Sequence, residues 1–240
     1  MKIGIIIQAR NGSTRLPKKV TLPFYNNQSI LEIILIKLKK LSLPIVIATT
    51  TNPEDDNISL IAKKEKAYVF RGNENNVLKR FIDCSHKFNF SHIIRVCADN
   101  PFLDIDLISE IIQKDVDYSA HFFKNKASIK THWGIFSEFV SLNALKKINL
   151  LTNAKIFQEH VTNYIYENQN EFKISKLNPP KICINKNIRL TVDTKNDFEI
   201  AKKIYQLCIQ KNKFKLEHII NCINQEIKQK MIHEIKNNNK

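Results

Sequence analysis

The chain has 240 residues, of which 43% are hydrophobic, 9% aromatic and 25% charged. This composition is typical of a globular protein and excludes a disordered chain or a collagen-like fibre. Apolar runs such as residues 30–36 are far shorter than the roughly 20 residues that cross a bilayer, so we expect no membrane span.

The balance of 38 Lys and Arg against 23 Asp and Glu gives a formal net charge of +15. A basic protein can bind nucleic acid, an anionic membrane or a phosphorylated small molecule. The lysines are spread along the chain, and the sequence has no aromatic and basic signature of RNA binding. Nucleic-acid binding therefore stays open only as the alternative from a different functional class.

The five cysteines are odd in number and have no CxxC or zinc spacing, so they indicate neither a disulfide framework nor a zinc site. Met1-Lys2 leads directly into a strand-like run, without the pattern of a signal peptide. We therefore expect reduced thiols and a cytoplasmic location.

The first predicted element is strand Ile3–Gln8, a continuous apolar run of the kind buried on both faces of a sheet. Residues 9–19 follow as a polar loop. Ser29 and Glu32 have the spacing of a capping box at the start of helix 30–41. The elements expected next are strand 45–49, a helix from Asn52-Pro53 to 66, strand 68–71, helix 74–87, strand 93–96 and helix 104–114.

Strands that alternate with helices predict an α/β fold built from parallel βαβ units. Ligands of such sheets bind beyond the carboxyl ends of the strands, where loops 9–19, 71–75 and 97–101 would lie. The chain after residue 115 is less regular. There we expect strand 136–140, helix 141–150, helix 155–168, strand 187–192, a helix 196–211 capped by Thr194, and a basic helical tail.

The most informative segment is the loop after the first strand, Gln8-Ala-Arg-Asn-Gly-Ser-Thr-Arg-Leu-Pro-Lys-Lys19. It carries four cations, and Gly12-Ser13 adds backbone N–H groups and a hydroxyl at a tight turn. Fixed amides and cations together are what a polyphosphate requires, although a solvated basic loop would have the same composition. The spacing matches neither GxxxxGK[ST] nor GxGxxG, which disfavours P-loop hydrolases and Rossmann dehydrogenases.

Six segments, taken in order, carry the motifs of one enzyme family. They are Ala9-Arg10-x-Gly12-Ser13-Thr14-Arg15-Leu16-Pro17-x-Lys19, Ala48-Thr49-Thr50-x-Asn52-Pro53-x-Asp55-Asp56, Phe70-Arg71-Gly72-x-Glu74-x-x-Val77-Leu78-x-Arg80, Arg95-Val96-x-Ala98-Asp99-Asn100-Pro101, Glu159-His160-Val161-Thr162-x-Tyr164-Ile165 and Leu190-Thr191-Val192-Asp193-Thr194-x-x-Asp197. Together they resemble the cytidylyltransferases of the CMP-KDO and acylneuraminate synthetase type, and most closely the spore-coat polysaccharide cytidylyltransferase-like group. The likeness spans about residues 3–205. Lys18 stands where that group usually has Gly, and Ala98 replaces a common Gly.

The resemblance implies a Rossmann-like, three-layer, mostly parallel sheet of the nucleotide-diphospho-sugar transferase (GT-A-like) type. It implies one nucleotidyltransferase domain over residues 1–225 and a basic tail over 226–240. The implied reaction transfers CMP from CTP to an acceptor sugar and releases pyrophosphate, for cell-surface polysaccharide or glycan biosynthesis. The implied catalytic residues are Arg10, Lys19, Asp99 and Asp193, and the implied nucleotide-binding residues are Gln8, Ala9, Arg10, Gly12, Ser13, Arg15, Lys19, Arg71, Gly72 and Asp99.

Mg²⁺ is the implied cofactor, because Asp99 and Asp193 match the family's two metal-binding aspartates. Mg²⁺ prefers oxygen ligands and typically uses one or two carboxylates plus phosphates. Each aspartate follows a predicted strand, so both would lie at one edge of the sheet if those strands are neighbours. Asp193 would alternatively be a favourable charge at a helix N-terminus, and Asp99-Asn100-Pro101 a simple turn.

The acceptor pocket is expected from residues after 100, with Asn100, Glu159 and His160 as acceptor-binding candidates. His160 would bind or deprotonate the acceptor, or have a structural role only. The favoured acceptor is an acidic sugar such as a nonulosonic acid; a sugar 1-phosphate, an alditol phosphate or another nucleotide remains an alternative. Because related synthetases are usually homodimers, residues 118–140 are the expected dimerisation or acceptor region, and His132 and Trp133 would line either.

Overall fold

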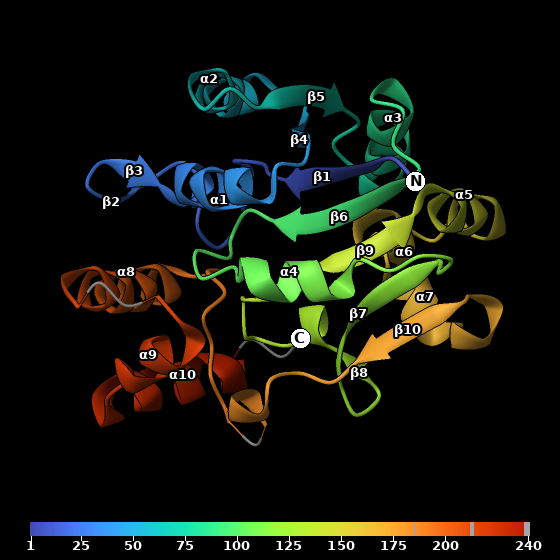
Figure 1. Cartoon of the computed structure of the whole chain (residues 1–240). Coiled ribbons are helices and arrows are strands. Elements are labelled where there is room, and N and C mark those ends of the chain that lie inside the picture. The colour runs from blue at the N-terminus through green and yellow to red at the C-terminus, as the bar shows by residue number, and fades with distance from the viewer. Residues whose placement is uncertain (185, 212–213, 238–240) are drawn as a thin grey trace.

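The computed structural model describes residues 1–184, 186–211 and 214–237. Within them an eight-stranded sheet runs in the order β10-β7-β9-β6-β1-β4-β5, with β8 paired to β7 (Figure 1). The half of the sheet that is built from the N-terminal strands is parallel, as the alternation of strands and helices in the sequence predicts. The parallel strands are β1 (Ile3–Gln8), β4 (Ile45–Thr50), β5 (Tyr68–Gly72) and β6 (His92–Cys97).

The second half of the sheet is mixed. Strand β9 (Glu138–Ser141) is antiparallel to β6 and to β7 (Tyr118–Phe123), whereas β10 (Ile174–Leu177) is parallel to β7. Strand β8 (Lys126–Ala127) forms a hairpin with β7. Strands β7 and β10 lie in the stretch that has no regular hydrophobic pattern, and the sequence analysis did not predict them.

Helices cover both faces of the sheet, which confirms the three-layer α/β class. Along β1, Ile5 and Ile7 enter one core and Ile6 enters the other, as the period of two in a strand requires. The first core is covered by α1 (Ile30–Leu38), α2 (Asp56–Lys64), α4 (Ile105–Ile111) and α8 (Lys195–Gln210). The second is covered by α3 (Val77–Lys87), α5 (Leu142–Leu151) and α7 (Asn163–Glu167).

Short elements complete the chain. The hairpin β2 (Pro23–Tyr25) and β3 (Gln28–Ser29) precedes α1, and the Ser29–Glu32 capping box is present as predicted. Helices α9 (Leu216–Asn221) and α10 (Gln225–Asn237) pack beside α8, and Ile227 and Met231 of α10 are buried. The remaining elements are α6 (Lys155–Glu159) and the 3₁₀ helices η1 (Lys39–Leu41), η2 (Pro53–Asp55), η3 (Ser128–Lys130), η4 (Gln169–Glu171) and η5 (Lys181–Cys183).

Two predicted elements are wrong. Residues 187–192 form no strand; the segment is buried from Ile188 onward, and the backbone N–H groups of residues 190–192 donate to two separate chain segments, at His132 O and Asp99 O. The expected helix 155–168 is broken into α6 and α7 at His160–Thr162. The break places the Thr162 hydroxyl against the Glu138 carboxylate at 3.0 Å, a buried contact that a continuous surface helix would not make.

The strand register places the predicted loops together. Gln8 is level with Ala48 of β4 and Cys97 of β6, so these three strands end at the same edge. In Figure 1 the arrowheads of β1 and β6 point to the side on which α8 lies. The described helices include no candidate for a membrane span.

Candidate active site

Asn11 holds the loop after β1 in shape. Its backbone N–H donates to Asp55 Oδ1 at 2.7 Å, and its side-chain amide donates to two groups of the segment 54–57. Its carbonyl oxygen accepts from the N–H groups of Ser13 and Lys18 at 2.8 and 2.9 Å. The loop is therefore closed on one buried residue and tied to the turn after β4. Lys18 adopts φ 59°, in the left-handed region, which accounts for the glycine usual at that position in the resembling group.

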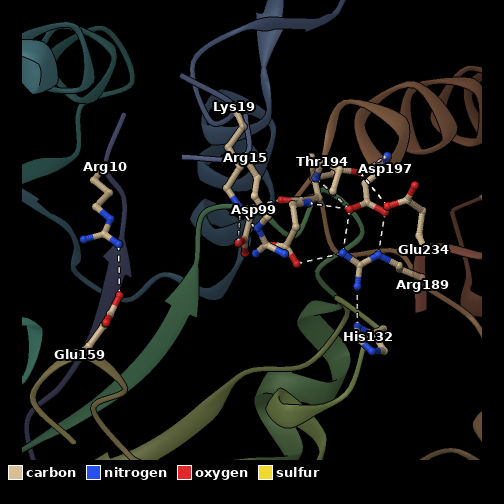
Figure 2. A network of polar contacts seen from close by, with 12 residues as sticks. Arg10, Arg15, Lys19, Asp99, His132, Glu159, Arg189, Thr194, Asp197 and Glu234 are labelled. Atoms are coloured by element: carbon tan, nitrogen blue, oxygen red, sulfur yellow. Dashed lines mark hydrogen bonds and ion pairs between the residues drawn. The ribbon is translucent and has the colours of Figure 1, made fainter. Parts of the chain in front are cut away.

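Lys19 joins Asp99 and Asp193, the two aspartates expected from the resemblance to bind metal. Its Nζ donates to Asp99 Oδ2 at 2.9 Å (Figure 2), to Asp193 Oδ1 at 3.1 Å and to Val192 O at 2.7 Å. Burial lowers the pKa of Lys19, but the charges and hydrogen bonds of the two carboxylates outweigh it and raise the pKa above its ordinary value. The ammonium is therefore charged at neutral pH, and both carboxylates lie at the sheet edge beside the loop.

Asp193 contacts two further cations. Its Oδ1 lies 3.0 Å from an Arg15 nitrogen, and its Oδ2 lies 3.0 Å from an Arg189 nitrogen. The hydrogen bonds and charges of Asp197 and Asp193 raise the pKa of Arg189 against the effect of burial. Asp193 is thus a buried carboxylate surrounded by three charged donors, Lys19, Arg15 and Arg189.

Arg10 of the loop pairs with Glu159, apart from the cluster around Lys19. An Arg10 guanidinium nitrogen donates to Glu159 Oε1 at 3.3 Å, and both side chains are partly exposed. Figure 2 shows this pair apart from the Lys19 cluster, on the side of the loop away from α8. The segment 159–160 is therefore brought to loop 9–19 from far along the chain.

These groups line a cleft of about 600 Å³ at the carboxyl ends of β1 and β6. The predicted residues in its lining are Gln8, Arg10, Gly12, Ser13, Arg15, Lys19, Asp99, Asn100, Glu159, His160 and Asp193. A second cleft, of about 810 Å³, is larger but lies at the amino ends of the strands, around Met1, His92 and Asp117. None of the predicted site residues lines it.

Three predicted nucleotide-binding residues do not line the cleft. Ala9 is buried beneath the loop at 2% exposure. Arg71 donates to Thr50 O at 2.8 Å and pairs with Asp56, so it braces the turn after β4. A Cβ atom at the adjacent Gly72 would lie 2.9 Å from the Phe70 ring, so this glycine is required by close packing.

Asp99 and Asp193 fit an oxygen-preferring divalent ion. Both reach the same ammonium, so both carboxylates lie near one point, and carboxylate oxygen is the ligand type that Mg²⁺ prefers. Across the described ranges no group of three or more His, Cys, Asp or Glu could hold a metal ion. A divalent ion here would therefore need further oxygens from substrate phosphates or water, as is usual for Mg²⁺.

Comparison with known proteins places the chain in a family. The family model described as cytidylyltransferase matches residues 4–239. The chain is a member of the cytidylyltransferase family. This membership confirms the family resemblance predicted from the six sequence segments. It also confirms the prediction that the protein is an enzyme, a nucleotidyltransferase.

Individual family members and neighbours agree with this result. The spore coat polysaccharide biosynthesis protein SpsF of Bacillus subtilis is 33% identical, with 92% of this chain and 94% of that protein covered. The structure of a cytidylyltransferase from Leptospira borgpetersenii superposes with a TM-score of 0.83 at 32% identity, covering 95% of this chain and 97% of that one. The CMP:2-keto-3-deoxy-manno-octonic acid synthetase complexed with CTP has a TM-score of 0.61 at 12% identity, covering 88% and 100%, and shows a shared fold.

Arg95 is a cleft residue whose contacts the sequence analysis did not foresee. One of its nitrogens donates to the fully buried Glu138 at 2.5 Å and another to Gln8 Oε1 at 3.3 Å. Burial disfavours its charge, but Cys97 and Glu138 raise the pKa of Arg95 above its ordinary value. Arg95 therefore stays charged and orients the Gln8 amide at the end of β1.

Other residues that line or support the cleft were not named individually in the prediction, although 128–131 and Gly134 lie within the expected dimerisation or acceptor region 118–140. Residues 128–131, Gly134 and Asn163 line the cleft, and Arg189 contacts Asp193 beneath it. Arg189 lies four residues before Asp193, a spacing that predicts side-chain pairing only in a helix, so nothing in this non-helical segment indicated the pair. His132, named without a settled role, accepts a hydrogen bond at Nδ1 from Arg189 at 2.5 Å, and Trp133 is buried in the core.

Proposed function

We propose that this cytidylyltransferase transfers CMP from CTP to a small sugar acceptor and releases pyrophosphate. The observation that carries the proposal is the position of Lys19, whose ammonium joins Asp99 and Asp193 beneath a cationic loop that opens into the cleft. A triphosphate needs fixed cations and amides on one side, and a divalent ion needs carboxylates on the other. The lining of the cleft contains both the cations and amides of the loop and the two carboxylates.

The loop is suited to hold the phosphates. Arg10 and Arg15 are partly exposed guanidinium groups that can grip phosphate oxygens with two N–H donors. A Cβ atom at Gly12 would meet nothing closer than Glu74 Oε1 at 3.9 Å, so the backbone there is open to a ligand. Ser13 adds a hydroxyl in the same lining. We assign these groups to the β- and γ-phosphates.

The proposed reaction is a substitution at the α-phosphorus. The acceptor hydroxyl oxygen forms a bond to the α-phosphorus, the bond from the α-phosphorus to the bridging oxygen breaks, and pyrophosphate leaves with that oxygen. The hydroxyl proton passes to a base, for which His160 in the cleft wall is our candidate. When bound by Asp99 and Asp193, Mg²⁺ supplies charge neutralisation at the phosphates, and Lys19, Arg10 and Arg15 stabilise the leaving group.

The part of the cleft lining that comes from residues after Asp99 is proposed to hold the acceptor. Asn100 is 4% exposed and its Oδ1 has no hydrogen-bond partner within the described residues, so this buried acceptor atom is suited to a ligand hydroxyl. Glu159 and His160 lie in the same lining, and Lys130, whose Nζ sits 5.0 Å from the Tyr166 ring centre, adds a cation. These groups support an acidic sugar, such as a nonulosonic acid, as the acceptor.

Similarity to a spore coat polysaccharide biosynthesis protein supports a role in surface polysaccharide or glycan biosynthesis. We also propose a cytoplasmic homodimer in which residues 118–140 contact the partner. Light scattering on the purified chain tests the dimer, since a monomer mass at micromolar concentration contradicts it.

Nucleotide binding tests the function before the acceptor is known. Thermal unfolding is measured with CTP, ATP, GTP, UTP or a single-stranded oligonucleotide, each with Mg²⁺. A ligand that binds only the native state raises the melting temperature, so we expect a rise with CTP above all others. A larger rise with another nucleotide, or with the oligonucleotide, contradicts the proposal. Pyrophosphate release with CTP and a panel of acidic sugars, sugar 1-phosphates and alditol phosphates then identifies the acceptor class.

A further inference from the structure

Arg189 is a fully buried arginine that lies behind Asp193, outside the cleft itself. Its side chain is 0% exposed. Its Nε and one terminal nitrogen donate to the two carboxylate oxygens of Asp197 at 2.7 and 2.8 Å, and that same terminal nitrogen donates to Asp193 Oδ2 at 3.0 Å (Figure 2). One guanidinium therefore links two carboxylates.

This link fixes how Asp193 is presented. Its Oδ2 is held inward by Arg189, and its Oδ1 is the oxygen that contacts Lys19 and Arg15 at the cleft. The Asp197 carboxylate also accepts from the backbone N–H of Asp193 at 3.0 Å. Asp197 thus holds the backbone of Asp193, and Arg189 holds its Oδ2. The other carboxylate oxygen, Oδ1, is left directed at the cleft.

The network continues away from the cleft in two directions. On one side, His132 Nδ1 accepts from Arg189 at 2.5 Å, so the guanidinium is held from its third nitrogen as well. On the other, Glu234 of α10 accepts from the Thr194 hydroxyl at 3.1 Å and from the Asn196 amide at 2.9 Å, at the first turn of α8. The start of α8 is thereby tied to the C-terminal helix.

We propose that Arg189 is a positioning residue that aims Asp193 Oδ1 at the divalent ion and phosphates of the nucleotide. This inference rests on the proposed function and adds a residue that does not touch the ligand. Only arginine has a planar fork of donors that can hold two carboxylates in fixed directions, whereas lysine is a point charge on a flexible stem. If Arg189 only stabilised the packing of α8, it would make the same hydrogen bonds, but its replacement would not change the effect of Mg²⁺ on CTP affinity.

The test measures the dissociation constant of CTP by calorimetry, once in EDTA and once in Mg²⁺. The constant in EDTA divided by the constant in Mg²⁺ is the metal enhancement of CTP binding. We compare wild type with Arg189→Lys, Arg189→Met and Asp193→Asn, and record the melting temperature of each. Changing a group that orients a metal ligand typically costs tenfold or more in metal affinity. We therefore expect both Arg189 variants to lose about tenfold of the enhancement, with the CTP affinity in EDTA little changed. Lys230→Met, at an exposed position of α10, is the control and keeps the wild-type ratio.

Each outcome of this test supports or overturns a stated claim. An unchanged ratio in folded Arg189→Lys and Arg189→Met overturns the inference, and so does a lower melting temperature with an unchanged ratio. If Arg189→Met does not fold, Arg189→Lys and Asp197→Asn replace it with the same expectation. Failure of every variant to fold shows a structural role and also overturns the inference. Absence of CTP binding by wild type in both buffers instead rejects the proposed function.

Discussion

Gly134 approaches Thr191 so closely that a Cβ atom at position 134 would lie 2.5 Å from the Thr191 backbone nitrogen. Gly134 also has φ +61°, a conformation that side chains rarely adopt. The contact is supported by the N–H of Leu190, which donates to His132 O at 2.9 Å. It joins the segment after β8 to the segment that carries Arg189 and Asp193, and it forms part of the cleft lining.

Gly134→Ala should therefore destabilise the protein. The left-handed conformation costs a side chain about 1–2 kcal/mol, and the clash is with backbone, which cannot rotate away. We expect a loss of about 2–4 kcal/mol in the free energy of unfolding once overpacking is included, measured by urea denaturation. Gly12→Ala is the matched control, because its Cβ would be open to the cleft. It should keep wild-type stability and weaken CTP binding, and equal stability of the two variants would contradict the argument.

The cationic loop was predicted from the residues themselves, and the distant segments that meet it at Asp99, Glu159 and Asp193 were named only through the family resemblance. The individual contacts between these segments were not predicted. The loop from Arg10 to Lys19 follows a buried strand, so its density of cations was visible in the chain itself. The partner that fixes Gly134 lies far along the chain, and nothing local to position 134 indicates it. The strand predicted over 187–192 failed for a related reason, since apolar residues at alternate positions indicate burial and not the neighbour with which the backbone pairs.

Lys19→Met should weaken both folding and CTP binding. The variant leaves the Asp99 carboxylate without the ammonium that it contacts at 2.9 Å. Loss of a charge-assisted contact costs about 1–3 kcal/mol, and we expect that amount in CTP affinity by calorimetry. The raised pKa of Lys19 means that its stabilisation is complete below the ordinary lysine pKa of 10.5 and is lost only as pH rises through the higher folded value.

The stability difference between wild type and Lys19→Met should accordingly be constant between pH 6 and pH 9, within about 0.5 kcal/mol. Urea denaturation across this range measures it. The exposed Lys63, changed to Met, is the control and should alter neither quantity. Unchanged CTP affinity in Lys19→Met would remove Lys19 from the triphosphate site.

Lys18→Gly should be tolerated, because the position already has the backbone that glycine prefers. Relief of the left-handed conformation at φ 59° gains about 1 kcal/mol, and the extra freedom of glycine in the unfolded chain costs about 0.5–1 kcal/mol. We expect stability within about 1 kcal/mol of wild type. Lys18→Val keeps the left-handed backbone and adds a β-branched side chain, for which positive φ is strongly disfavoured, so this variant should be less stable than Lys18→Gly. Equal stability of the two variants would show that the loop does not require this conformation.

Lys37 on α1 supports the turn that follows Asp99. Its Nζ donates to Pro101 O at 2.7 Å and to Leu103 O at 3.4 Å. Burial lowers the pKa of Lys37 to about 8, and the charge of Asp104 offsets only part of this effect. A neutral amine still has N–H donors, so the contact with Pro101 O survives deprotonation.

The lowered pKa of Lys37 makes stability depend on pH in a stated direction. Between about pH 8 and pH 10.5 the unfolded chain holds a proton that folded Lys37 has released, so the free energy of unfolding rises with pH. We expect wild type to gain about 2–3 kcal/mol relative to Lys37→Met over this range. Urea denaturation of both proteins measures the difference, and a titrating thiol that does not interact with Lys37, such as that of Cys84, cancels because both proteins contain it. A difference that stays flat or falls with pH would show that folded Lys37 remains charged.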